Sequence, residues 1–407
     1  MTLLQSTIKK RLFNPFTAFL KTEQASGIIL IVCTLVSIIV SNTQWGEAYI
    51  HFWHEKIGVA GFGAEFKLSV EHWINDGLMV VFFLVVGLEI KRELLTGELS
   101  SVKKASLPLI AALGGMVVPA IIYFAINKGT PTEHGWGIPM ATDIAFALGI
   151  LSLLGKRVPV SLKVFLTALA VVDDLGAILV IAVVYTQTVV LQSLYIALGI
   201  FVFLLVLNRL KVANIFIYLL GGAFMWYFML KSGVHATIAG VLLAAAIPMN
   251  SPYSNHSPAE LLEHSLHQFS SFVIMPLFAL ANTCIVFNTN VFSIYGTELG
   301  LGIILGLLLG KPLGIAGFSF LAVKTKIASL PANAGFKKVI GIGFLGGIGF
   351  TMSIFISILA FKEIEIQTFS KIAVLTGSML SGLLGYILIY MGINKKQVDV
   401  ATEELTE

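Results

Sequence analysis

Apolar runs of about the length that crosses a lipid bilayer recur along the whole chain. A spanning helix needs about 20 mostly apolar residues, and it satisfies its backbone hydrogen bonds internally, as lipid requires. The runs therefore predict an all-α polytopic membrane protein. They define twelve spans, at residues 24–41, 74–90, 105–126, 136–154, 158–185, 190–208, 213–230, 233–248, 266–283, 299–322, 339–361 and 372–393.

Composition excludes a soluble domain. Hydrophobic residues make up 57% of the 407 residues and charged residues 12%, against about 25% charged residues in globular domains, and the mean hydropathy is +0.91. The net charge of +4 is scattered over short loops, so it does not indicate a nucleic-acid partner. We expect the protein to be surrounded by membrane lipid, with neither nucleic acid nor a small organic substrate as partner.

The distribution of basic residues predicts the orientation. With twelve spans, nineteen of the 26 Lys and Arg residues fall on one side of the membrane and six on the other. Because short cytoplasmic loops are enriched in such residues, both termini are expected in the cytoplasm. The remaining cation, Lys311, lies in the middle of the tenth span. It either serves a buried acidic site or extends along the helix to the membrane interface.

Three aspartates, Asp143, Asp173 and Asp174, lie inside the fourth and fifth spans. An ionised carboxylate near the bilayer centre costs roughly 2.5 to 3.5 kcal/mol on insertion scales, which predicts a function for these groups. Burial raises the pKa of a carboxyl group and a nearby lysine lowers it, so such a group can exchange a proton for a hard cation. Adjacent residues point about 100° apart on a helix. We therefore assign Asp174 as the main cation and proton carrier, and Asp173 as a neighbour that ligates the ion or pairs with Lys311.

The chain resembles the NhaA family of sodium/proton antiporters over nearly its whole length. Two motifs around the aspartates and one around Lys311 carry the resemblance, supported by further blocks in the same order. They are Ala141–Ala147, Val171–Ala177, Gly310–Gly314, Trp73–Asp76, Gly87–Glu93, Gly233–Thr237, Leu262–His264 and Gly346–Thr351.

The resemblance implies electrogenic exchange of Na⁺ or Li⁺ for protons by alternating access, with activity regulated by pH. It implies a homodimer in a bacterial inner membrane and no cofactor. The ion would bind at Asp173 and Asp174, close to Asp143 and Thr142, with Lys311 as electrostatic partner. The residues linked to pH regulation are Glu263, His264, His267, Glu89, Arg92 and His235.

Two alternatives remain open within this last set. Glu89 and Arg92 are spaced i, i+3, which suits an ion pair on one helix face. His235 stands alone in an apolar setting, so a packed core histidine is the competing interpretation.

Glycine and proline interrupt two spans. In the fourth span they come just before Thr142 and Asp143, and in the eleventh Gly346, Gly347 and Gly349 come just before Thr351. Interruptions in both halves of a transporter indicate broken helices near the midplane, a rule for which the NhaA family is itself a standard example. The competing interpretation is that these glycines only permit close helix packing. Asp143 would either compensate the half-helix N-termini or ligate sodium, and the two threonines would supply hydroxyl ligands or satisfy freed backbone groups.

The longest loop joins the first two spans, from Asn42 to Glu71. Alternating residues around Ala48 to Trp53, with Gly61 and Gly63 beyond them, predict a short external β-hairpin, which the resemblance places at a dimer contact. Residues 1–395 are predicted to form one transport domain, and residues 396–407 a polar cytoplasmic tail.

Two other classes of protein compete with the antiporter. An intramembrane enzyme could use two aspartates as acid and base, but neither Asp143 nor Asp173 stands in the Gly-x-Gly-Asp setting of intramembrane aspartyl proteases. A cation channel is the other class. It is disfavoured because titrating carboxylates and broken helices suit alternating access better than a continuous pore.

Overall fold

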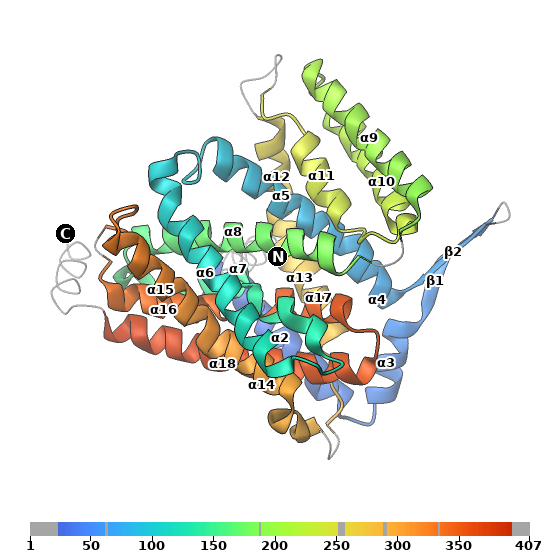
Figure 1. Ribbon diagram of the computed structural model, residues 1–407. Helices are drawn as coiled ribbons and strands as arrows, with labels where there is room; N and C mark the ends of the chain where they lie inside the picture. The colour runs from blue at the N-terminus through green and yellow to red at the C-terminus, as the bar shows by residue number, and fades with distance from the viewer. Residues whose placement is uncertain are drawn as a thin grey trace, which may run out of the picture.

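The structure is a computed structural model that describes residues 23–61, 64–186, 189–250, 257–287, 291–332 and 334–392. Nearly all of its elements are helices (Figure 1). The predicted polar tail, residues 396–407, lies outside the described residues.

The described residues contain eight helices that are long and apolar enough to cross a membrane, or ten if each of two bent helix pairs counts as one span. Two predicted spans are not among these ten. The span at 233–248 corresponds to α11 (Ile238–Ala246), whose nine residues are only about 14 Å long. The span at 266–283 lies in a helix from Pro258 to Asn282 whose first half is polar. The chain is thus a mostly helical polytopic membrane protein, and the full set of twelve spans stays a prediction.

The helices follow the predicted spans closely, and the largest differences are in the helices that contain the ninth and twelfth predicted spans, which begin eight residues before those spans. The first half of the chain comprises α2 (Glu23–Ser41), α3 (Gly46–His54), β1 (Lys56–Gly61), β2 (Ala64–Ser69), α4 (Val70–His72), the π-helix η1 (Trp73–Leu78), α5 (Met79–Leu95), α6 (Val102–Asn127), the 3₁₀-helix η2 (Glu133–Met140), α7 (Ile144–Leu153), the 3₁₀-helix η3 (Gly155–Arg157) and α8 (Val160–Val184). The second half comprises α9 (Leu191–Arg209), α10 (Ile215–Ser232), α11, α12 (Pro258–Phe269), the π-helix η4 (Ser270–Ile274), α13 (Met275–Asn282), the 3₁₀-helix η5 (Val291–Gly296), α14 (Glu298–Leu305), the π-helix η6 (Gly306–Gly310), α15 (Lys311–Lys324), α16 (Phe336–Gly346), α17 (Phe350–Ala360) and α18 (Ile364–Met391).

The predicted β-hairpin is confirmed, but it starts later than the alternating residues suggested. Strands β1 and β2 pair antiparallel, with Lys56 opposite Ser69, and the hairpin projects from the helices (Figure 1). The segment from Ala48 to Trp53 is instead part of helix α3, which meets α2 at 114°. Its alternation misleads because Tyr49 and Trp53, four residues apart on one helix face, pack edge to face at a ring distance of 5.6 Å.

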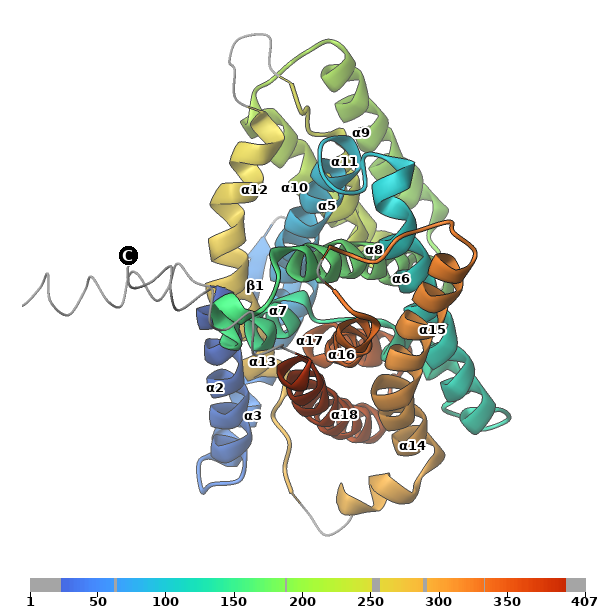
Figure 2. The ribbon, with the colours of Figure 1, turned by 90° about the vertical axis from the view of Figure 1, so that its left-hand side faces the viewer.

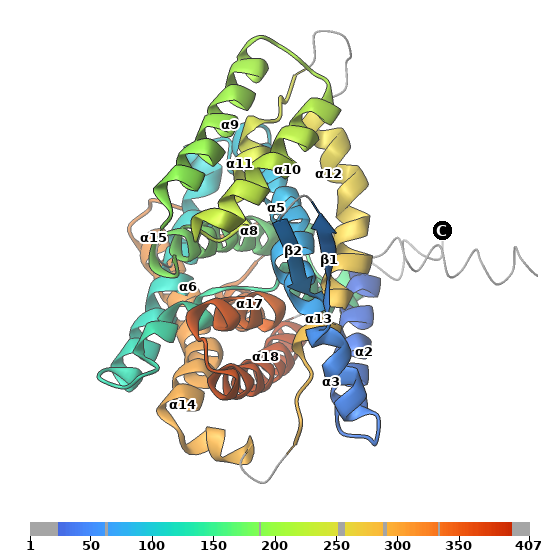
Figure 3. The same cartoon turned by 90° about the vertical axis from the view of Figure 1, so that its right-hand side faces the viewer.

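The two segments with predicted interruptions lie near the middle of the molecule. Helices α7, α8, α16 and α17 lie near the centre of Figure 2, whereas α9 and α10 lie together at the periphery in Figure 3. Only 11% of the most apolar stretch of α9 is buried inside the molecule, so the rest of this helix is available to lipid. Helix α5 joins two hydrophobic clusters, since Phe83 belongs to the larger one and Leu84 and Leu88 to the smaller.

Helices α6 and α15 approach each other closely through glycine. A Cβ atom at Gly114 would lie 2.3 Å from the carbonyl oxygen of Gly314, and a Cβ atom at Gly314 would lie 2.0 Å from the carbonyl oxygen of Gly114. Small residues permit such contacts between membrane helices. Because Lys311 is one turn before Gly314, this contact also fixes the position of that lysine.

Candidate ion-binding site

The first helix break lies between η2 and α7. Residues Ala141 to Asp143 are outside any helix, with extended backbone at both ends of the segment. Asp143 is the N-cap of α7, and its Oδ1 accepts a hydrogen bond from the backbone N–H of Phe146 at 2.9 Å. A carboxylate here satisfies a free N–H group and faces the positive end of the helix dipole. The glycine- and proline-rich segment of the sequence thus precedes three residues, Ala141 to Asp143, that lie outside any helix.

The second break lies between α16 and α17, whose axes differ by 44° across residues Gly347 to Gly349. Position 347 requires glycine because there is no room for a side chain: a Cβ atom there would lie 2.3 Å from the carbonyl oxygen of Leu307. The backbone conformation does not require glycine, since a φ of −74° suits any residue. At Gly346 and Gly349 a Cβ atom would instead meet side chains, Ile315 Cδ1 at 2.7 Å and Ser353 Oγ at 2.1 Å. The glycines therefore serve close packing at the same place where the helix breaks, and the two interpretations made from sequence do not exclude each other.

The two breaks cross and satisfy each other's backbone groups. The backbone N–H of Asp143 donates to the carbonyl oxygen of Ile348 at 2.6 Å. The Oγ1 of Thr142 lies 2.7 Å from the carbonyl oxygen of Gly346, the last residue of α16. Broken helices leave such groups without intrahelical partners, and in an apolar interior each must find another.

Asp143 caps both half-helices. Besides the bond from α7 to its Oδ1, its Oδ2 accepts from the backbone N–H of Thr351 at 3.2 Å and from the Thr351 hydroxyl at 2.5 Å. The carboxylate is buried and both of its oxygens are engaged. Of the two interpretations made from sequence, this geometry matches compensation of the half-helix dipoles.

Asp173 on α8 forms a buried ion pair with Lys311 on α15. Lys311 Nζ donates to Asp173 Oδ2, and both side chains are 0% exposed. Lys311 Nζ also donates to Thr142 Oγ1 at 2.9 Å, and Thr142 Oγ1 lies 2.6 Å from the same Asp173 oxygen. The lysine therefore does not extend to the membrane interface. Lys311 contacts the C-terminal end of α16 only indirectly, through the Thr142 hydroxyl. This hydroxyl has one proton, which it can donate either to Asp173 Oδ2 or to the carbonyl oxygen of Gly346.

Asp174 faces a different way and lines a cavity of about 310 Å³. Asp173 is not among the lining residues, as expected for neighbours that point about 100° apart on a helix. Neither Asp174 Oδ1 nor Asp173 Oδ1 has a hydrogen-bond partner, although both atoms are buried. A buried carboxylate oxygen without a partner is costly, so these two oxygens can accept a proton or ligate a cation. The polar side chains that line the cavity include Ser26, Glu89, Asp143, Asp174, His264 and His267.

Charged residues of α5 and α12 form ion pairs next to this cavity, and Glu89, His264 and His267 among them line it. Arg92 pairs with Glu263 at 3.0 Å and with Glu93 at 2.9 Å, whereas His267 Nδ1 lies 3.1 Å from Glu89. The ion pair that the spacing of Glu89 and Arg92 suggested is therefore replaced by pairs between the two helices. Glu263 precedes the predicted ninth span. Burial raises the pKa of its carboxyl, and Arg92 offsets only part of this rise.

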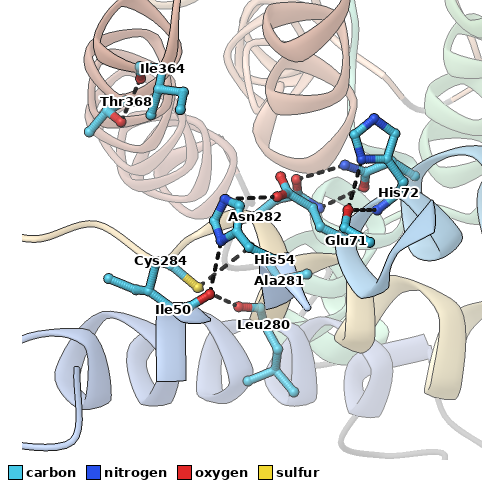
Figure 4. Close-up of polar contacts among 12 residues, drawn as sticks. Ile50, His54, Glu71, His72, Leu280, Ala281, Asn282, Cys284, Ile364 and Thr368 are labelled. Carbon is cyan, nitrogen blue, oxygen red and sulfur yellow. Dashed lines mark hydrogen bonds and ion pairs between the residues drawn. The ribbon is translucent and has the colours of Figure 1, made fainter. Parts of the chain in front are cut away.

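His235 lies apart from this cluster. Its Nε2 is 2.8 Å from the carbonyl oxygen of Tyr185, and the ring is half-buried in the wall of a second cavity of about 990 Å³. Neither a fully packed core histidine nor a ligand beside Asp174 describes this position. The same cavity is lined by Asp76 at the start of the second span, and by His54 and Glu71, which face each other at 3.6 Å (Figure 4).

Sequence reasoning missed most of this second cavity. His54 lies on α3, which was predicted as a strand, and Lys371 was placed in a loop before the twelfth span although α18 already begins at Ile364. It also missed three buried serines that bond distant backbone groups. They are Ser353, which donates to Ile138 at 2.6 Å, Ser381, which donates to Leu307 at 3.2 Å, and Ser378, described below. No pattern in the sequence marks such serines, because their partners lie on other helices.

Comparison with known proteins agrees with the resemblance seen in the sequence. A family described as "Na+/H+ antiporter 1" matches residues 17–389. A Na(+)/H(+) antiporter NhaA of Flavobacterium psychrophilum is 54% identical over 371 residues, which cover 91% of this chain and 94% of that protein. One from Dechloromonas aromatica is 55% identical over 380 residues, covering 93% and 96%. NhaA 1 of Flavobacterium johnsoniae is 53% identical over 379 residues, covering 93% and 97%. With matches of this extent, the chain belongs to the NhaA family of Na⁺/H⁺ antiporters, which are secondary transporters and not enzymes.

Proposed function

We propose that this protein exchanges Na⁺ for protons at Asp174, with Asp173 as second ligand. The observation that carries the proposal is the pair of buried carboxylate oxygens without partners, Asp174 Oδ1 and Asp173 Oδ1, on adjacent residues beside a cavity. Oxygen atoms of this kind suit a hard monovalent cation or a proton, and only one of the two species can occupy the same lone pairs.

Charge balance explains why the two species compete. The three aspartates and Lys311 give the site a net charge of minus two when all four are ionised. Such a charge in an apolar interior is costly, so the site is occupied by a cation or by protons at all times. Asp173 is held by Lys311 while the site is empty of cation, and it turns to the ion when Na⁺ binds next to Asp174. Li⁺, a smaller hard cation, binds to the same oxygens.

The exchange is electrogenic. Two carboxyl groups can each bind one proton, and a single cation displaces both protons, so net charge crosses the membrane. Alternating access carries the site between the two sides of a twelve-span bundle. The crossing of the two breaks supports this step, since α7 and α17 meet at Asp143 and a shift of either half-helix moves the carboxylate.

We propose that pH regulates the protein through the charged residues of α5 and α12, where Arg92 pairs with Glu263, Glu89 lies 3.1 Å from His267, and His264 lines the cavity. Protonation of the Glu263 carboxylate removes its charge and so weakens its pair with Arg92. The protein is located in a bacterial inner membrane with both termini in the cytoplasm. It forms a homodimer through the β1–β2 hairpin, with lipid around the remaining surface.

Everted membrane vesicles test the exchange. Vesicles that contain the wild-type protein and an imposed proton gradient should lose the gradient when Na⁺ or Li⁺ is added, and should respond little to K⁺. Asp174→Asn should abolish the response, because an amide neither binds a proton nor balances the cation. Glu298→Gln, which alters an exposed carboxylate at the start of α14, is the matched control and should behave as wild type.

Two outcomes contradict the proposal. A gradient that collapses in the Asp174→Asn vesicles as fast as in wild type would show that Asp174 is not the carrier. Sodium flux that is independent of the proton gradient would indicate a channel.

A further inference from the structure

The N-terminus of half-helix α17 has a second cap, Ser378 of α18. The Ser378 Oγ accepts hydrogen bonds from the backbone N–H groups of Gly349 at 3.2 Å and Phe350 at 3.1 Å. Ser378 is 5% exposed, and α17 has no side-chain cap from its own N-cap residue, Gly349. The cap is therefore supplied by another helix.

Two other hydroxyls of α18 bond within their own helix. Ser370 donates to the carbonyl oxygen of Ile366 at 2.8 Å, and Thr376 to that of Ile372 at 2.9 Å, each one turn back in the same helix. This is the usual local bond of Ser and Thr in helices. Ser378 instead serves α17, so its position reflects a need of the half-helix.

The first N–H groups of α17 are divided between a neutral and a charged cap. Gly349 and Phe350 donate to Ser378, whereas Thr351 donates to Asp143. A helix N-terminus carries roughly half a positive elementary charge, concentrated on these groups. If Asp143 were the only cap, its carboxylate would be drawn more strongly toward α17 and away from the cavity that it lines with Asp174.

We infer that Ser378 is a positioning residue for cation exchange, because it shares the N–H groups of α17 with Asp143 and so lets that carboxylate keep its place in the wall of the cavity that Asp174 also lines. The inference rests on the exchange proposed above. It predicts that loss of the Ser378 oxygen strengthens the hold of α17 on Asp143 and so weakens cation binding, without removing the carrier residues.

The test compares four proteins in vesicles: wild type, Ser378→Ala, Ser378→Thr and Ser370→Ala. An N-cap Ser→Ala change costs about 1 kcal/mol, equivalent to about a five-fold change in an equilibrium constant. We expect Ser378→Ala to raise the Na⁺ concentration for half-maximal response about five-fold at unchanged maximal rate. Ser378→Thr, which keeps the acceptor oxygen, should restore most of the affinity. Ser370→Ala, which removes an equally buried hydroxyl from the same helix, should leave the affinity unchanged.

The outcomes separate this inference from the proposed exchange. If wild type shows no Na⁺-dependent response, the proposed function itself fails. If wild type responds and Ser378→Ala has wild-type sodium affinity, Ser378 does not position the site. A lower thermal stability and maximal rate with unchanged affinity would assign Ser378 a purely structural role. If the alanine protein does not fold, Ser378→Cys carries the test, since a thiol is similar in size but a weak acceptor, and the same five-fold loss is expected.

Discussion

Removal of the buried cation is expected to destabilise this protein in a pH-dependent way. Lys311→Met keeps the length of the side chain but leaves Asp173 without its ion-pair partner, and both groups are 0% exposed. Breaking a buried pair by removing one partner costs about 3 to 5 kcal/mol. With an unfolding entropy of roughly 2.1 cal/mol/K per residue, a chain of 407 residues would lose about 4 to 6 °C in Tm.

The sign of the pH effect follows from the charge left behind. At acid pH the lone carboxyl of Asp173 takes up a proton, so no buried charge remains and the Tm deficit shrinks. At alkaline pH the carboxylate stays charged and the deficit is largest. Thermal unfolding of the detergent-purified protein, followed by intrinsic fluorescence at several pH values, measures this directly.

Two further variants sharpen the test. Lys311→Met combined with Asp173→Asn removes both charges and should recover most of the lost Tm, because a neutral pair leaves no uncompensated charge. Lys324→Met removes a lysine from the exposed end of the same helix and should have little effect. Our account of the site is refuted if Lys311→Met and Lys324→Met give equal shifts, or if the deficit of Lys311→Met is the same at all pH values.

Two other predictions concern regulation and packing. Glu263→Gln holds this group in the uncharged form, which the wild type adopts only at lower pH, so the activation profile in vesicles should move to higher pH; an unchanged profile with a lower maximal rate would argue for a structural role. Gly314→Ala introduces a Cβ atom 2.0 Å from the carbonyl oxygen of Gly114, whereas Gly317→Ala on the same helix meets no atom within 4 Å. Gly314→Ala should therefore lower Tm and weaken exchange, and equal behaviour of the two alanine variants would contradict the close contact of α6 and α15.

The charged residues of the site could be predicted from sequence because a charged side chain inside a membrane span has a high free-energy cost, and its neighbours in the same span do not offset that cost. Asp173 and Asp174 are adjacent, and helix geometry alone required them to face different surroundings. In the structure Asp173 contacts Lys311, and Asp174 faces the cavity. The identity of the partner of Asp173 was one of two options, since sequence distance says nothing about which spans touch.

Features that depend on tertiary contacts could not be predicted from the sequence. The i, i+3 spacing of Glu89 and Arg92 suggested an ion pair, but each residue has a partner on α12, and a pair on an exposed helix face is worth only a few tenths of a kcal/mol. Likewise, the bonds that Ser378 accepts join backbone groups 28 and 29 residues away. When a helix breaks, its free backbone groups bond to side chains of other helices. No residue type in the sequence identifies which side chains these are.

The separation of the buried ion pair along the chain has a consequence for how the protein is made. Asp173 precedes Lys311 by 138 residues, and at a synthesis rate of about 5 to 20 residues per second the lysine follows roughly 7 to 28 s later. During that interval α8 must partition into lipid without its counter-charge. Its most apolar window has a mean hydropathy of 2.3 despite the two aspartates. The leucine, valine and isoleucine residues of α8, rather than Lys311, thus carry both carboxyl groups into the bilayer.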